Sequence, residues 1–104
     1  MMKSRIITIC GSLKFEGIMK EISEKLEFEG NCVLSVIYPT KSKDSYSSKE
    51  IESLSKMHLQ RIEMSDAIFI VNVDGYIGEA TTYEMNYAKS LNKEILSLVP
   101  LTNV

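Results

Sequence analysis

A glutamate among apolar neighbours is the residue of this sequence best suited to covalent chemistry. In the segment 79–91, the positions Ala80, Glu84, Tyr87, Ala88 and Leu91 follow helical spacing and form one stripe. The stripe is apolar except for Glu84, and a carboxylate on a core-facing stripe is costly unless it is paired or has a task. The amino end of a helix also favours the charged form of a carboxyl group, which suits a nucleophile. We therefore expect Glu84 to be partly buried and ionised at neutral pH; the alternative is a solvated or tyrosine-bonded glutamate on a slightly rotated helix.

A glycine-serine pair, Gly11-Ser12, is a second candidate, because it follows an apolar run and precedes a helical pattern. Glycine lets a ligand approach the backbone, serine can cap a helix or bind a ligand, and amides at a helix start attract phosphate. The pair lacks the further residues of a Walker loop or a dinucleotide fingerprint. The alternative interpretation is a tight turn with a serine cap.

The single histidine, His58, has Arg61 one helical turn later. The two side chains could contact an anionic ligand or a second subunit; the alternative is a core histidine satisfied by one hydrogen bond. No group of histidine, cysteine and aspartate residues has metal-ligand spacing, so we expect no metal, and no cofactor is expected either.

Alternating strand and helix patterns must position these residues. Short apolar runs bounded by turn residues predict strands at 5–10, 32–37, 67–73 and 94–99. Amphipathic spacing predicts helices at 14–29 and 79–91, and a third after the polar loop 40–50, capped by Ser47 or Ser48. Such alternation is typical of an α/β fold, and we expect one domain over residues 1–104. The predicted architecture is a small flavodoxin-like, or Rossmann-like, three-layer sandwich with a four-stranded parallel sheet in the order 2-1-3-4.

This topology alone predicts where a ligand binds, independently of any sequence motif. Ligands of such folds bind at the carboxyl ends of the strands, at the switch point between strands 1 and 3. The loops at that point follow Cys10 and Val73. The same topology places Cys10 and Cys32 at opposite ends of neighbouring strands, so we expect no disulfide between them. Both lie in apolar runs and are expected to be buried free thiols.

Composition excludes several classes of partner. The formal net charge is -2 and 25% of the residues are charged, with no basic cluster, which argues against a nucleic acid polymer as ligand. Two cysteines are too few for a disulfide-stapled secreted fold. No apolar run is long enough to span a membrane and no signal peptide is visible, so we expect a cytoplasmic protein without a membrane partner.

The segment Ser65–Leu98, SDAIFIVNVDGYIGEATTYEMNYAKSLNKEILSL, resembles the nucleoside 2-deoxyribosyltransferase family and the related deoxynucleoside 5'-monophosphate N-glycosidases. The likeness consists of an Asp that opens a strand, a glycine-containing loop and a helix with Glu in a Tyr-Glu-x-x-x-Ala-like context; the first strand followed by Gly11-Ser12 also fits. In the order of strands and helices the resemblance covers most of the chain, whereas the motif residues themselves cover about a third of it. The resemblance implies that Glu84 attacks the anomeric carbon of a nucleoside or nucleotide. A glycosyl-enzyme forms, and water or a second base resolves it.

The resemblance also implies that the partner is a small-molecule nucleoside or nucleotide and that the protein forms a homo-oligomer, a dimer. The position where the transferases carry an Asp before the glutamate corresponds to Gly78, which leaves the proton-donating role to Asp74 or Glu79. The residues expected to bind substrate are Gly11, Ser12, Gly75, Tyr76, Gly78, Thr81 and His58. The alternatives to N-glycosidic cleavage or transfer are a non-catalytic nucleotide-binding or sensing domain and a small dimeric scaffold.

Overall fold

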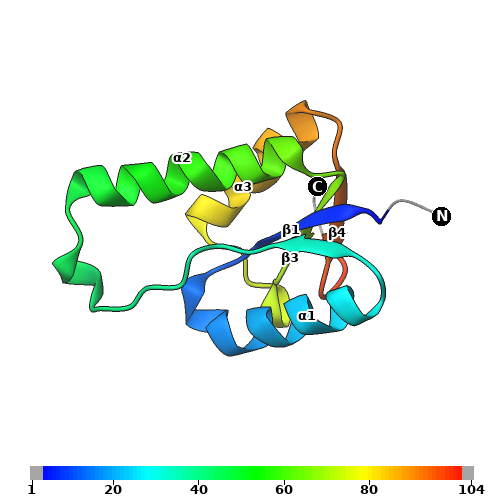
Figure 1. The fold of residues 1–104 in the computed structure, drawn as a ribbon, viewed down its shortest axis with the longest axis horizontal. Coiled ribbons are helices and arrows are strands. Elements are labelled where there is room, and N and C mark those ends of the chain that lie inside the picture. Colours follow the sequence, from blue (N-terminus) through cyan, green and yellow to red (C-terminus); the bar gives the residue numbers. More distant parts are fainter. Residues whose placement is uncertain (1–3, 102–104) are drawn as a thin grey trace.

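The computed structural model describes residues 4–101, so residues 1–3 and 102–104 of the expected domain lie outside the described part (Figure 1). Four strands form one parallel sheet in the order β2-β1-β3-β4, which confirms the predicted topology. The strands are β1 (Ile6–Cys10), β2 (Cys32–Leu34), β3 (Ala67–Ile70) and β4 (Glu94–Ser97). The α-helices are α1 (Glu16–Phe28), α2 (Ser48–Met64) and α3 (Glu79–Ser90), and short 3-10 turns lie at Leu13–Phe15, Lys43–Ser45 and Val73–Gly75.

The sheet is covered on both faces, with α1 on one side and α2 and α3 on the other (Figure 1). Side chains along a strand alternate between the two faces, so β1 contributes to both layers. Ile7 and Ile9 pack in the α1 layer, whereas Cys10 packs in the layer under α2 and α3. Thr8 faces the α2 side too, where its hydroxyl bonds to Ser65 and donates to the Arg61 carbonyl. Because β1 is central and buried on both faces, the thiol of its last residue, Cys10, lies buried between the sheet and the layer of α2 and α3.

The strands are shorter than predicted. The expected strand at 32–37 pairs only over Cys32–Leu34, because β2 is an edge strand and the chain then leaves the sheet towards α2. The expected strand at 67–73 pairs as β3 up to Ile70, and the one at 94–99 ends at Ser97. Asn72, 1% exposed, binds the chain beyond β4 with its side chain, accepting from the amides of Leu98 and Val99. Hydrogen bonds from the Asn72 side chain thus join the two segments beyond the last paired residues of β3 and β4.

Helix ends follow the predicted signals. Gly30 ends α1 with a φ of 98°, a conformation that favours glycine. Ser47 is the N-cap of α2 and forms a capping box, in which its hydroxyl accepts from the Glu50 amide and the Glu50 carboxylate accepts from the Ser47 amide. This cap fixes the start of a helix whose first half extends beyond the sheet (Figure 1).

Two predictions about burial were wrong in part. Cys10 is buried and free as expected, but Cys32 is exposed, because it begins the edge strand rather than lying under a helix. The stripe predicted on α3 is rotated by about one position: Thr81, Met85 and Ala88 are its buried residues. Ala80 and Leu91 are exposed, and Glu84 lies at the border of the buried stripe. The helix therefore presents Glu84 partly to the core and partly to the end of the sheet.

Among residues 4–101, none of the helices has both the length and the apolar character needed to cross a lipid bilayer.

Candidate functional site

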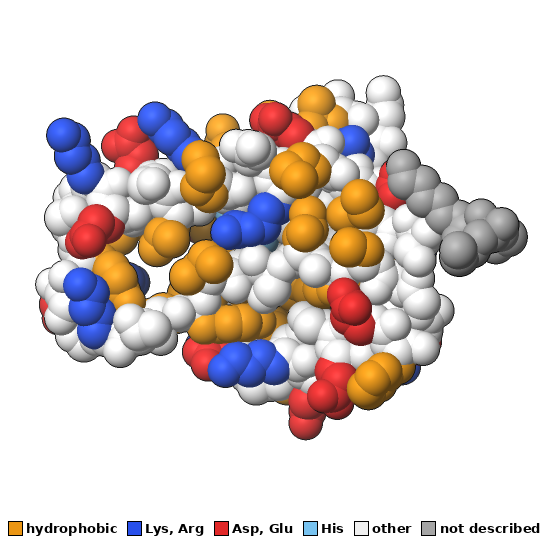
Figure 2. Space-filling view, viewed as in Figure 1, with side chains coloured by type: hydrophobic (Ala, Val, Ile, Leu, Met, Phe, Trp, Pro, Cys, Tyr) orange, Lys and Arg blue, Asp and Glu red, His pale blue; other side chains and the backbone are white. Residues whose placement is uncertain are grey.

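A cavity of about 800 Å³ opens at the carboxyl ends of the strands, where the topology predicted a site. Its floor comes from the loop after β1 and the first turns of α3. Its walls come from the segment 36–46 and from the projecting half of α2, and Figure 2 shows the surface hollowed between these two. The lining residues are Gly11, Ser12, Leu13, Lys14, Val36, Ile37, Tyr38, Pro39, Thr40, Lys41, Lys43, Tyr46, Ile51, Leu54, Ser55, His58, Tyr76, Gly78, Glu79, Ala80, Thr81 and Glu84. The volume is within the range of small-molecule sites.

Cationic and aromatic side chains line the outer part of this cavity. The Lys14 ammonium lies 3.5 Å from the centroid of the Tyr76 ring, and the Lys41 ammonium lies 4.8 Å from that of Tyr46. With Lys43, these make three lysines among the lining residues, against two glutamates. Rings beside ammonium groups suit a ligand that combines a planar base with an anionic group.

A thiol, an imidazole and a carboxyl group meet in the wall formed by α2, α3 and the end of β1. Cys10 Sγ lies 3.6 Å from His58 Nε2, and His58 Nε2 lies 3.9 Å from Glu84 Oε1. The Cys10 and His58 side chains are buried, whereas the Glu84 side chain keeps 19% of its surface exposed and lines the cavity. Glu84 is thus the member of the three that a ligand contacts most easily.

Burial dominates the ionisation of this cluster. Desolvation raises the pKa of Glu84 to about 7, and a hydrogen bond from the Cys10 thiol opposes that rise. Desolvation, with the nearby charge of Arg61, lowers the pKa of His58 to about 4, so the imidazole is neutral at pH 7. Burial, followed by the negative charge of Glu84, raises the pKa of the Cys10 thiol, which stays protonated.

The expectation that the ionised form of Glu84 dominates at neutral pH is therefore wrong, because a pKa of about 7 leaves both forms populated. Glu84 is the sixth residue of α3, which begins at Glu79. The helix dipole acts mainly within the first turn, so it does not offset the effect of burial at this position.

The same three residues are the described group with atoms suited to a metal ion, all within 4.8 Å of one another. Their hydrogen bonds do not fit that role as they stand. His58 Nδ1 lies 3.1 Å from Nη1 of Arg61, which can only donate, so Nδ1 accepts and the neutral ring carries its proton on Nε2. Nε2 is the nitrogen that would have to bind the ion. A ligating histidine normally donates its other N–H to an acceptor, and Arg61 is not one.

Eight of the ten residues expected at the site line the cavity: Gly11, Ser12, His58, Tyr76, Gly78, Glu79, Thr81 and Glu84. Asp74 and Gly75 do not. They form an exposed turn after β3, in which Asp74 has a φ of 54° and Gly75 a φ of 82°. Asp74 is therefore not among the groups that a ligand in the cavity would meet.

The two loop residues after β1 have structural roles besides any contact with a ligand. A Cβ at Gly11 would lie 3.2 Å from the Val71 Cβ and 3.3 Å from the Val71 carbonyl oxygen, so a side chain there would make a tight contact with the neighbouring strand end. The Ser12 hydroxyl accepts from the Lys14 amide over 3.4 Å, a long bond that leaves the hydroxyl able to bind elsewhere.

Sequence reasoning missed the second half of the cavity. It treated the segment 40–50 only as a polar loop that leads into a helix. Residues of this segment and of the first turns of α2 form a wall of the cavity that includes Lys41, Tyr46, Ile51 and Leu54. It also missed Cys10 as a neighbour of Glu84. The position of Cys10 at the carboxyl end of a central strand was the available signal.

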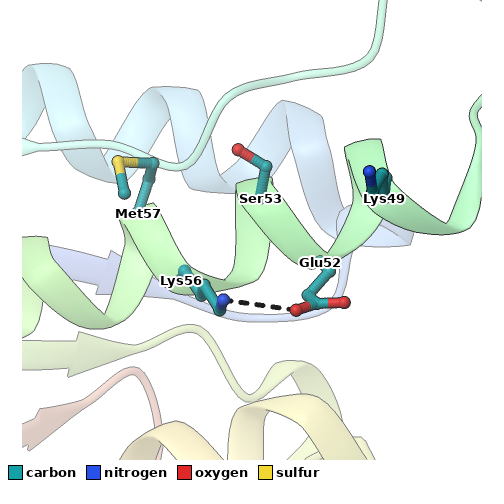
Figure 3. Close-up of a pocket in the computed structure, with 5 residues that line it drawn as sticks. All are labelled: Lys49, Glu52, Ser53, Lys56 and Met57. Atoms are coloured by element: carbon teal, nitrogen blue, oxygen red, sulfur yellow. Dashed lines mark ion pairs between the residues drawn. The ribbon is translucent and has the colours of Figure 1, made fainter.

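A second, smaller hollow lies on α2 itself, with a volume of about 320 Å³ (Figure 3). Its lining residues, Lys49, Glu52, Ser53, Lys56 and Met57, all belong to this one helix, and an ion pair of 3.2 Å joins Glu52 to Lys56. Exposed side chains of a single helix do not converge on a ligand, so we assign no site there.

No family model and no curated protein matches this chain.

Proposed function

We propose that this protein cleaves or transfers the N-glycosidic bond of a nucleoside or nucleoside 5'-monophosphate, with Glu84 as the nucleophile. The observation that carries the proposal is a half-buried carboxyl group facing a cavity at the topological switch point, with a pKa of about 7. A perturbed carboxyl group in a cleft of this kind is typical of a functional site. The resemblance of the segment 65–98 to nucleoside deoxyribosyltransferases supports the same residue.

In the proposed reaction, an ionised Glu84 oxygen attacks the anomeric carbon, and the carbon–nitrogen bond to the base breaks. The electron pair of that bond stays on the base, which takes a proton from an acid. Glu79 has this role in our proposal, because it is the other carboxyl group that lines the cavity. Water, or the nitrogen of a second base, then loses a proton to the Glu79 carboxylate and attacks the anomeric carbon, and the ester bond to Glu84 breaks. Two displacements thus retain configuration.

Three features support a nucleotide as the ligand. Lys14, Lys41 and Lys43 supply positive charge for a phosphate. No side chain caps the amino end of α3, and its first residues line the cavity, so amides there can bind an anion. Tyr38 also lines the cavity, and its buried hydroxyl has no hydrogen-bond partner among the described residues. A polar group of the ligand would satisfy it.

The setting that we propose is the cytoplasm, in agreement with an exposed free thiol at Cys32. We also propose a dimer as the oligomeric state. Neither membrane nor nucleic acid polymer is a partner in this proposal.

The test is incubation with a panel of nucleosides and 5'-monophosphates, followed by chromatography for free base. Glu84→Gln should lower kcat/KM by at least about 10³-fold, because the amide cannot form the glycosyl ester, while ligand affinity stays within a few fold. Glu52→Gln, on α2 but outside the cavity lining, is the matched control and should leave the rate unchanged. A glycosyl ester on Glu84, trapped with a slow-leaving analogue and seen by mass spectrometry, would establish the mechanism. Binding without cleavage would support the alternative, a nucleotide-binding or sensing domain.

A further inference from the structure

The buried groups behind Glu84 are not used by the chemistry described above, yet they form a continuous series. Arg61 Nη1 lies 3.1 Å from His58 Nδ1, and His58 Nε2 lies 3.6 Å from Cys10 Sγ. The Cys10 sulfur, a His58 ring nitrogen and a Glu84 carboxylate oxygen all lie within 4.8 Å of one another. Four side chains from α2, β1 and α3 thus connect a half-buried guanidinium to the group that faces the cavity.

The direction of these bonds follows from the chemistry of each group. An arginine only donates, so Nδ1 of His58 accepts. A neutral imidazole has one N–H, and with Nδ1 as acceptor that hydrogen is on Nε2, directed towards the Cys10 sulfur. The sulfur then accepts, which leaves the thiol hydrogen for an ionised carboxylate, a group that only accepts. Every donor therefore points towards Glu84.

We propose that Arg61, His58 and Cys10 form a directed hydrogen-bond chain that orients the Glu84 carboxylate and stabilises its ionised form. The proposal rests on the function proposed for Glu84. Cys10, which is 1% exposed, acts through Glu84 and has no contact with the cavity, so it is a positioning residue and not a catalytic one. Its thiol fixes one carboxylate oxygen and leaves the other free for the anomeric carbon.

The variants Cys10→Ala and Cys10→Ser separate this role from simple packing. Alanine removes the donor, whereas the serine hydroxyl keeps it in a similar volume. Cys32→Ala, at the exposed thiol, is the matched control. We expect Cys10→Ala to raise the pKa of Glu84, measured by ¹³C NMR of the labelled carboxyl group, and to move the acid limb of kcat/KM to higher pH. Its kcat should fall by about ten- to a hundred-fold through misorientation, with KM little changed, and Cys10→Ser should restore most of both.

The tautomer of His58 is a second readout, which needs neither activity nor a folded Cys10→Ala variant. ¹⁵N NMR of the wild-type imidazole should show the proton on Nε2, and Arg61→Met should introduce the Nδ1-protonated form. A proton on Nδ1 in the wild type would overturn the proposal, as would a Glu84 pKa that is the same in Cys10→Ala and Cys32→Ala.

These outcomes are distinct from a failure of the proposed function. If the wild type cleaves no nucleoside or nucleotide while the NMR results are as expected, the hydrogen-bond chain is supported and the proposed reaction is contradicted. If the wild type is active and Cys10→Ala has an unchanged pH profile, the proposed reaction is supported and the hydrogen-bond chain is contradicted.

Discussion

His58 Nε2 lies 3.9 Å from Glu84 Oε1, and burial moves the pKa of these two side chains in opposite directions. The low-dielectric setting favours the neutral form of each side chain. Their titrations therefore have opposite effects on folding, and single substitutions should reveal each one.

The stability of the protein between pH 4 and 7 should depend on which of the two groups remains. Glu84 has a folded pKa of about 7 against 4.5 for the free side chain, so the folded state binds more protons and Glu84 lowers stability as pH rises through this window. His58 has a folded pKa of about 4 against 6.5, so the unfolded state binds more protons and His58 raises stability as pH rises. In the wild type the two trends largely cancel.

We expect urea unfolding of Glu84→Gln to show stability that increases from pH 4 to 6.5, and that of His58→Gln to show stability that decreases from pH 4.5 to 7. The groups facing Glu84 are Cys10 and His58, with Arg61 behind them, and burial raises the pKa of the Cys10 thiol out of this range. Parallel curves for wild type and both variants would contradict the assignment.

The pH dependence of catalysis should follow the ionisation of Glu84. A nucleophile must be deprotonated, so the acid limb of kcat/KM should rise with pH, with a midpoint near the Glu84 pKa of about 7. The measurement is base release from the best substrate over pH 5–9, with a stability check at each pH. Full activity at pH 5 would mean that another group is the nucleophile, or that substrate binding lowers the Glu84 pKa strongly.

The sequence was sufficient to predict the sheet, its strand order and the edge at which the cavity opens. Each of these follows from local patterns, namely apolar runs, turn residues and strict strand–helix alternation. The rotation of the α3 stripe was not predictable in the same way, because Ala80 and Thr81 are both small and only packing against the sheet decides which one is buried. Glu84 was correctly expected to be partly buried, although the stripe that buries it is centred one position away from the predicted one.

Local sequence patterns could not predict the cluster behind Glu84, because its members come from positions 10, 58, 61 and 84, which lie far apart along the chain. Each residue alone has an ordinary interpretation: a buried thiol, a core histidine, a surface arginine. Their proximity depends on how α2 crosses the end of β1, and no spacing along the chain encodes that crossing. The exposure of Cys32 depends likewise on how far α1 extends over the edge strand.

Ser12 should discriminate between phosphorylated and free ligands. Its hydroxyl lines the cavity and makes one long bond, so it is free to bind a phosphate oxygen. We expect Ser12→Ala to weaken binding of a nucleoside 5'-monophosphate by about five- to ten-fold, a typical loss for one hydrogen bond, and binding of the nucleoside much less. Calorimetry with both ligands checks this. Equal losses would indicate that Ser12 touches only the sugar or serves only as a cap.

The capping box at Ser47 should control the wall of the cavity more than the stability of the whole protein. The first half of α2 projects beyond the sheet, and Ile51 and Leu54, which line the cavity, are 45% and 39% exposed. Because few tertiary contacts hold these turns, the cap contributes much of their local stability.

We expect Ser47→Ala to destabilise this end of α2 by about 1 kcal/mol, the usual effect of losing a serine N-cap. Hydrogen exchange of the amides at 50–54 should accelerate by about five-fold, which is the factor that this free energy corresponds to, while the melting temperature changes little. Ser48→Ala is the matched control, since Ser48 follows the cap as the first residue of α2 and the capping bonds belong to Ser47. Ligand affinity should fall in Ser47→Ala and not in Ser48→Ala, because ordering the frayed wall on binding opposes association. A large drop in melting temperature with unchanged exchange at 50–54 would show instead that α2 unfolds only with the rest of the domain.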